Sequence, residues 1–267
     1  MSIDHRKFTT LNHQQHIDYI LHLADTTLIL AQRNSEWCAH GPILEQDIAI
    51  TNISLDLLGQ SRNFYQHAAT LINQSTNKPI NETEDSLAYL RTEREFRNLL
   101  ITELPNGDWA QTILRQFFFS VYQFLLYEQL QKSSDEQLAA IAQKSNKEIA
   151  YHIKWGSEWV IRLGDGTDES NARMKKAIET LWEYTGELFI PADYEIELAK
   201  GGIGADPSLL KQQWLQKINE VFEEATLTVP AGGFMQTGGK QGAHTEHLGF
   251  ILAEMQSLQR TYPGAEW

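Results

Sequence analysis

Residues 42–72, PILEQDIAITNISLDLLGQSRNFYQHAATLI, decide the fold, because their apolar side chains recur at steps of three and four residues. This spacing is typical of one long amphipathic helix. Pro42 suits the first turn, where its missing amide hydrogen costs no hydrogen bond. A second pattern of the same kind covers residues 14–37, and His40, Gly41 and Pro42 separate the two. The sequence therefore predicts two long helices joined by a short connection.

The rest of the sequence predicts further helices and no strand. Residues 73–85, NQSTNKPINETED, are polar and indicate a loop. Helices are expected over about 86–102, 109–127, 135–163, 169–189, 194–199, 207–226 and 244–260, with a Gly-rich loop at 230–242. Short connections within each pair of long helices predict an all-α, ferritin-like antiparallel four-helix bundle with additional C-terminal helices. We expect a single domain over 1–267, with a core bundle over about 14–163 and additional helices over about 169–260.

Composition excludes several classes of partner. The chain has 35 acidic and 22 basic residues, a formal net charge of -13, and would be repelled by a phosphate backbone or an anionic membrane surface. We therefore expect neither nucleic acid nor a membrane as a partner. The first residues, MSIDHRKFTT, lack the apolar stretch of an export signal, and residues 117–127 are too few to cross a bilayer. Cys38, the single cysteine, cannot form an internal disulfide, which favours a cytoplasmic protein.

Ferritin-like bundles often hold two metal ions, so we searched the sequence for the ligand pattern of such a site. A carboxylate-bridged di-iron site takes a Glu from each of two helices and a Glu-x-x-His pair from each of the other two. His5 is expected to precede the first helix, and none of the eight histidines from His13 onward has Glu or Asp three positions earlier. The segment 112–127 contains no carboxylate at all. We therefore expect this chain to bind no metal and no cofactor.

The individual helices show how the pattern fails. Glu36 and His152 could still act as ligands, but Ile149 stands where the Glu of a Glu-x-x-His pair would be. In the second helix Leu57 and Gln60 have that same spacing, with a hydrocarbon and an amide in place of the carboxylate and the imidazole. Two scattered ligands cannot neutralise two metal ions in a dry core.

Both remaining ligands also have structural interpretations. Glu36 is expected in the bundle core, paired with Arg33, Arg62 or His152, because buried charges are normally paired. His152 is expected to be a hydrogen-bonded core histidine. A polar column at helical spacing should form a hydrogen-bond network in place of the metal; it comprises Asn52, Asp56, Gln60 and Asn63.

Four long segments carry a resemblance to a known family. They are SEWCAHGPILEQDIAITNISLDLLGQSRNF (35–64), LRTEREFRNLLITELPNGDWAQTILRQFF (90–118), EIAYHIKWGSEWVIRLGDGTDES (148–170) and GGKQGAHTEHLGFILAEMQSLQRTYPGAEW (238–267). They resemble the non-catalytic C subunit of the bacterial phenylacetyl-CoA 1,2-epoxidases of aerobic phenylacetate breakdown. The likeness covers nearly the whole chain and departs from the family only at the N-terminus and in the loop 73–85.

The resemblance implies a role as well as a fold. In that family, the non-catalytic subunit is a ferritin-like paralogue of the di-iron catalytic subunit that has lost the iron ligands and binds its catalytic counterpart directly. The complex uses dioxygen and electrons from NADPH, relayed through a reductase subunit that carries flavin and an iron–sulfur cluster. The resemblance then implies five degenerate di-iron positions in this chain, at Glu36, Leu57, Gln60, Ile149 and His152. It also implies a structural subunit that pairs with the di-iron catalytic subunit and with other subunits of the epoxidase.

A substrate-proximal surface is a further expectation. Arg91, Arg94 and Arg97 recur every third residue and could grip the phosphates of a CoA tail; a solvated helix face paired with Glu93 and Glu95 is the equal alternative. The resemblance favours phenylacetyl-CoA near the interface with the catalytic subunit. The expected positions are Arg94, Glu95, Phe96, Arg97, Asn98, Ile196, Glu197 and Leu198.

Two alternative functions and one further cluster of possible metal ligands need to be considered. A self-sufficient di-iron oxygenase requires iron in the isolated chain, and a stand-alone acyl-CoA-binding protein requires tight CoA binding without a partner. His244, Glu246 and His247 look like a metal cluster, but residues two apart face different directions on a helix. We expect them to cap the last helix or to meet a partner.

Overall fold

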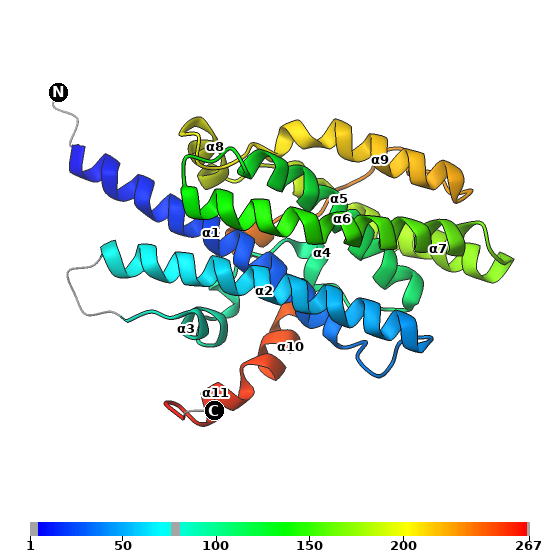
Figure 1. The fold of residues 1–267 in the computed structure, drawn as a ribbon, viewed down its shortest axis with the longest axis horizontal. Helices are drawn as coiled ribbons and strands as arrows, with labels where there is room; N and C mark the ends of the chain where they lie inside the picture. Colours follow the sequence, from blue (N-terminus) through cyan, green and yellow to red (C-terminus); the bar gives the residue numbers. More distant parts are fainter. Residues whose placement is uncertain (1–4, 76–80, 266–267) are drawn as a thin grey trace.

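The computed structural model describes residues 5–75 and 81–265, except for the side chains of 5–12, and within these ranges it contains helices and no strand (Figure 1). The core helices are α1 (His5–Ser35), α2 (Leu44–Ser75), α5 (Trp109–Leu130) and α6 (Glu136–Gly164). Helix α1 packs antiparallel on α2, and α5 packs antiparallel on α6 (Figure 1). The prediction of an all-α, ferritin-like bundle is confirmed.

Helix α5 is the centre of the molecule. It is buried on nearly every side, and most of its buried side chains are apolar. Beyond α6, it also packs against α7 (Asp168–Leu181) and α9 (Lys211–Glu224). The Phe118 ring lies 5.3 Å from the Trp214 ring, whose Nε1 donates to the Phe118 carbonyl at 2.9 Å. No helix in the described part of the chain has the length and apolarity that a membrane crossing needs.

The remaining elements differ from the predicted ones mainly at their ends. The crossover between the two core pairs holds α3 (Glu84–Tyr89) and α4 (Leu100–Glu103); α8 (Asp193–Lys200), α10 (Glu246–Met255) and α11 (Ser257–Thr261) follow later. The helix predicted over 169–189 ends at Leu181 and continues as two short 3-10 turns. His5 begins α1 and does not precede it. Of the loop predicted over 73–85, residues 76–80 lie outside the described residues.

The prediction of a continuous helix over 86–102 is wrong. Hydrogen bonds from polar side chains of α1 explain why. Asp25 accepts a hydrogen bond from the Arg97 amide at 2.8 Å, and Thr26 accepts one from the Leu99 amide at 3.3 Å. The His22 ring bonds with the Arg97 carbonyl at 2.7 Å. Because α1 satisfies these backbone groups, the segment between α3 and α4 is extended apart from one 3-10 turn at Glu93–Glu95.

Two arginines hold the end of α4 and the loop 104–108. Arg33 donates to the Glu103 carbonyl at 2.8 and 3.0 Å, and Arg115 donates to the Leu104 carbonyl at 2.6 Å and to the Asn106 side chain. Arg115 is fully buried, and burial lowers its pKa to about 9. The LPNGD string therefore has a structural role, because its Leu104 and Asn106 supply the oxygen acceptors that the buried Arg115 guanidinium needs.

A buried ion pair anchors the crossover to α1. The Asp25 carboxylate is fully buried and bonds with the Arg91 guanidinium and, at 2.5 Å, with the Tyr65 hydroxyl. Arg91 also stacks 4.4 Å from the centre of the Phe96 ring. Arg91 therefore points inward and does not share a face with Arg94 and Arg97, so the predicted three-arginine stripe does not form.

We expect Arg91→Ala to lower the free energy of unfolding by about 3–5 kcal/mol, because it leaves the Asp25 carboxylate buried without its partner. Arg62→Ala is the matched control, since Arg62 is 69% exposed and its ion pair with Glu84 has an N–O distance of 3.4 Å. The control should cost less than about 1 kcal/mol. Chemical denaturation measures both, and equal losses would contradict the role given to Asp25.

Candidate functional site

Side-chain amides form hydrogen bonds between the helices in the interior of the bundle. Gln60 of α2 is buried, donates to the Glu148 carboxylate of α6 at 3.0 Å and accepts from the Gln123 amide of α5 at 2.9 Å. Gln123 also donates to the Tyr127 hydroxyl at 3.1 Å. Nearer the other end of α5, Gln116 accepts from the Asn34 amide at 2.7 Å. Hydrogen bonds between amides thus join α1, α2 and α5, and the bond from Gln60 to the Glu148 carboxylate adds α6.

His152 belongs to the same side of α6. Its ring is fully buried, and Nε2 lies 3.0 Å from a carboxylate oxygen of Asp56 on α2. One helical turn further along α6, the Trp155 indole donates to Gln46 at 3.0 Å, as does that of Trp159 at 2.7 Å. Of the predicted polar column, Asp56 and Gln60 do join α2 to α6, whereas Asn52 is exposed.

The five predicted di-iron positions do not all meet. Leu57 and Ile149 are fully buried, and they lie with Gln60 and His152 on the facing sides of α2 and α6. Glu36 lies outside the interior, contrary to expectation. Helix α1 ends at Ser35, and the Glu36 side chain, 41% exposed, accepts from Arg33 and from Asn106, each at 2.8 Å. The pairing with Arg33, one of the three expected, is the one that forms.

The donor set at these positions does not fit a carboxylate-bridged di-iron centre. Such a centre needs carboxylates from all four helices and two imidazoles. Here both Glu-equivalent positions hold hydrocarbons and His152 is the one imidazole, while the carboxylates of Asp56 and Glu148 bond with His152 and Gln60. The polar groups of α5 beside Gln60 are an amide and a hydroxyl. In the described part of the chain, the single group of three close His, Cys, Asp or Glu donors is His16, His67 and Asp135, which includes none of the five positions.

A small cavity lies between α1 and α5. It measures about 10 Å³ and is lined by groups that include His22, Thr26, Gln123 and Tyr127. A space of this size holds about one water molecule. An aromatic acyl group is far larger, so this cavity cannot serve as a substrate chamber.

A second polar region forms where the loop around residues 238–242 docks on the crossover. The Glu187 carboxylate accepts from the amides of Leu100, Gly238 and Gly239, at 2.7, 2.8 and 2.8 Å. Burial raises the pKa of Glu187 more than these hydrogen bonds lower it. A Cβ atom at Gly239 would lie 2.2 Å from the Asn98 carbonyl oxygen, so only glycine permits this approach.

Lys240 continues this region into the core. It is 1% exposed, and its Nζ donates to Glu195 of α8 at 2.8 Å and to the Ile190 carbonyl at 3.0 Å. Glu195 also lies 3.8 Å from the buried His22 ring, whose pKa is lowered chiefly by burial. The charged groups compensate one another, which makes this cluster a structural one.

The HTEHLG string fixes the last helices to α4. Glu103 is fully buried; one carboxylate oxygen accepts from the Thr245 amide at 2.6 Å and the other bonds with His244 Nδ1 at 2.8 Å. Burial lowers the pKa of His244, but the hydrogen bond and the charge of Glu103 outweigh it, so the net pKa is raised. Thr245 caps α10. The expected capping is therefore performed by Thr245, and His244 pairs with Glu103.

Of the two predicted substrate-proximal segments, the first contacts the beginning of α8 through Arg97. The Arg97 guanidinium lies 5.8 Å from the Tyr194 ring and forms an ion pair with Asp18 at 3.1 Å. Arg97 and the Tyr194 hydroxyl both donate to the Lys240 carbonyl, at 3.5 and 3.2 Å. Of the eight predicted positions, Phe96, Asn98 and Leu198 are buried, Arg97 and Ile196 are half-buried, and Arg94, Glu95 and Glu197 are exposed.

Fold and interior together define an all-helical, ferritin-like bundle protein whose core is joined by amides. The chain belongs to the family of phenylacetic acid catabolic proteins, which it matches over residues 2–267. It is 48% identical over 249 residues to the C subunit of the 1,2-phenylacetyl-CoA epoxidase of Escherichia coli (strain K12). That alignment covers 93% of this chain and 98% of the relative. The resemblance read from the sequence is confirmed.

The pair of His244 and Glu103 should make stability depend on pH. Because the folded pKa of His244 is raised above its usual 6.5, its contribution is full below pH 6.5 and is lost as pH rises through the folded pKa. We expect the difference in unfolding free energy between the wild type and His244→Gln to shrink across that window. Urea denaturation from pH 6 upward measures it, with the exposed His40→Gln as control. A difference that is constant with pH would contradict this account.

Proposed function

We propose that this chain is a non-catalytic, structural subunit of a phenylacetyl-CoA 1,2-epoxidase, which pairs with the di-iron catalytic subunit in aerobic phenylacetate degradation. The name of the relative, which is one component of such an epoxidase, supports the assignment. The observation that carries it is the contrast between the two faces of α2. One face closes the bundle with residues that do not suit a metal, and the other is an apolar surface without a cover.

The inner face of α2 carries Ile53, Leu57 and Phe64, all fully buried, with Gln60 between them. The outer face, at the opposite helical angle, carries exposed aliphatic side chains at spacings of three, four and seven residues. These are Leu44 (72% exposed), Ile48 (52%), Leu55 (59%) and Leu58 (41%), which we call the α2 outer stripe. A row of exposed aliphatic side chains along one side of a helix, on a chain of this charge, is typical of a protein–protein interface.

In this proposal the chain supplies no redox chemistry. Dioxygen is activated at the di-iron centre of the catalytic subunit, and the reductase subunit, with its flavin and iron–sulfur cluster, delivers electrons from NADPH. This chain, acting as one domain in the cytoplasm, covers an apolar face of the catalytic subunit. An interface of this kind typically buries more than about 2,000 Å².

We expect Leu55→Glu to weaken binding to the catalytic subunit by roughly 30-fold, because it places a carboxylate in the centre of the α2 outer stripe. Leu209→Glu is the matched control, since Leu209 is 75% exposed on a different element, the 3-10 turn Pro207–Leu210. Co-purification and titration with the purified catalytic subunit measure both. Equal affinity of the Leu55→Glu variant and the wild type would rule out the stripe as the interface.

The activity of the complex tests the wider proposal. Epoxidation by the reconstituted subunits should fall when this chain is left out, and this chain alone should show none. If omission leaves the rate unchanged, the structural role is refuted.

We further propose that the surface around Arg94 and Arg97 lies near the CoA part of the substrate at the interface. Arg97 is engaged by Asp18 and Tyr194, whereas Arg94 is exposed and no described residue bonds with its guanidinium. Arg94 is therefore the residue whose charge remains available to a phosphate group.

In the complex, Arg94→Ala should raise the KM for phenylacetyl-CoA roughly tenfold and leave kcat nearly unchanged, because it removes one charge-assisted contact in substrate binding. Steady-state kinetics measures the change. Arg173→Ala, which removes another exposed arginine on α7, should leave KM as it is. An unchanged KM in the Arg94→Ala complex would remove the substrate-proximal role.

A further inference from the structure

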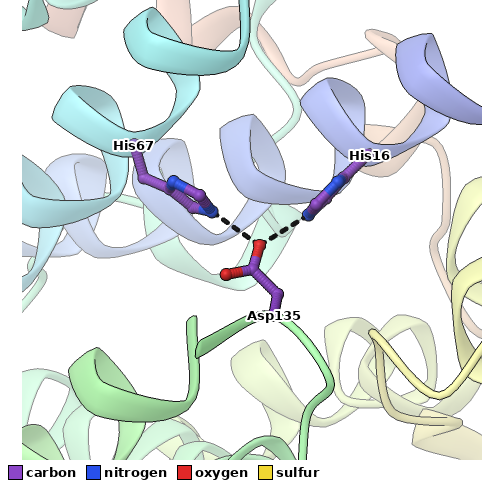
Figure 2. A group of neighbouring side chains, drawn as sticks. All are labelled: His16, His67 and Asp135. Atoms are coloured by element: carbon purple, nitrogen blue, oxygen red, sulfur yellow. Dashed lines mark hydrogen bonds and ion pairs between the residues drawn. The ribbon is translucent and has the colours of Figure 1, made fainter. Parts of the chain in front are cut away.

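Three side chains from distant parts of the sequence meet at the start of α6. His16 lies on α1, His67 lies on α2, and Asp135 is the N-cap residue of α6 (Figure 2). His67 Nε2 lies 2.6 Å, and His16 Nε2 2.9 Å, from the same oxygen of Asp135, Oδ2. The three side chains are 10–14% exposed, so the group is sheltered but still reached by water.

The hydrogen bonds within this group are incomplete. Asp135 Oδ1 already accepts from the amides of Gln137 and Leu138, each at 3.0 Å. Oδ2 is left to face two imidazoles. His67 has a hydrogen bond with it, but the contact of His16 lacks hydrogen-bond geometry, and its buried Nε2 has no hydrogen-bond partner among the described residues. A buried polar atom without a partner is costly, so a missing partner is indicated.

A divalent cation would be such a partner. Two imidazole nitrogens and one carboxylate oxygen form a ligand set that zinc and its neighbours in the first transition row accept. All three donor atoms lie within 4.8 Å of one another. In a tetrahedral zinc site the ligands lie roughly 2.0–2.2 Å from the ion, so the donors are about 3.3 Å apart. The distance from each imidazole Nε2 to Asp135 Oδ2 must therefore increase by less than about 1 Å. Small rotations of the side chains are sufficient for this change.

The location explains what such an ion would do. Helix α1 packs on α2, whereas α6 packs on α5, so His16 and His67 belong to one core pair and Asp135 to the other. An ion bound to all three would tie the pairs together at the beginning of α6. None of the three residues belongs to the bundle interior around Gln60 and His152, so this site is separate from the degenerate di-iron positions.

We propose that His16, His67 and Asp135 form a zinc site, with the remaining coordination position taken by water, that fastens α6 to the α1–α2 pair. The assignment is independent of the proposed function, because it concerns a different part of the molecule and needs no partner protein.

The test uses the full-length chain without an affinity tag, freed of metal with a chelator and then titrated with zinc chloride. Calorimetry and elemental analysis should give one zinc ion per chain, and zinc should raise the midpoint of thermal unfolding. Substitution by cobalt should give the visible absorption bands of a site with nitrogen and oxygen ligands. Failure of the wild-type chain to bind zinc would overturn the proposal.

Variants show whether the binding belongs to these residues. His67→Ala should weaken zinc binding by roughly a hundredfold or more and abolish the thermal shift. Asp135→Asn is the second variant, because asparagine still caps α6 while the anionic ligand is lost. Circular dichroism verifies that both variants are folded.

His40→Ala is the control, since His40 is exposed beside Cys38 on the α1–α2 connection and could bind zinc weakly by itself. It should bind zinc as the wild type does. Undiminished affinity in both His67→Ala and Asp135→Asn, or loss of binding in His40→Ala alone, would refute the site.

Discussion

Gln60 occupies the point where three of the four core helices meet, and the rest of the bundle depends on its amide being satisfied. It donates to Glu148 of α6 and accepts from Gln123 of α5. An amide that loses a partner in a dry core costs about 1–3 kcal/mol, so the three helices are held in one register. In the equivalent place a di-iron bundle holds anionic ligands that require a metal. Here the Gln60 amide is satisfied by Gln123 and Glu148, so this point of the core is held together by hydrogen bonds between side chains.

A second set of polar groups determines how the crossover and the C-terminal helices attach. His22, Asp25 and Thr26 of α1 bind the backbone of the segment 97–99, and Glu103 and Glu187 then bind the amides of the later loop. Strings such as LPNGD, GGKQG and HTEHLG thus have structural roles: they supply the acceptors, glycines and caps that this attachment needs.

The sequence predicted α2, α5 and α6 closely, and α1 except for its first nine residues, because long amphipathic patterns and the breakers between them are local properties. It failed over 86–102, where the intrinsic preference for helix is overcome by hydrogen bonds from α1, which is distant in sequence. The prediction that Glu36 lies in the core was wrong for a related reason. Its partner Asn106 belongs to the loop 104–108, which lies just beyond the end of α1. The group of His16, His67 and Asp135 could not be found from ligand spacing, because each residue comes from a different helix.

We expect this chain to provide no di-iron centre and to act through its surfaces. The iron content and Mössbauer spectrum of the purified chain, after expression in iron-rich medium and with the catalytic subunit treated in parallel, test this expectation. This chain should show no oxo-bridged iron pair, and the catalytic subunit should show one. An oxo-bridged cluster with about two iron ions per chain in this protein alone would contradict it.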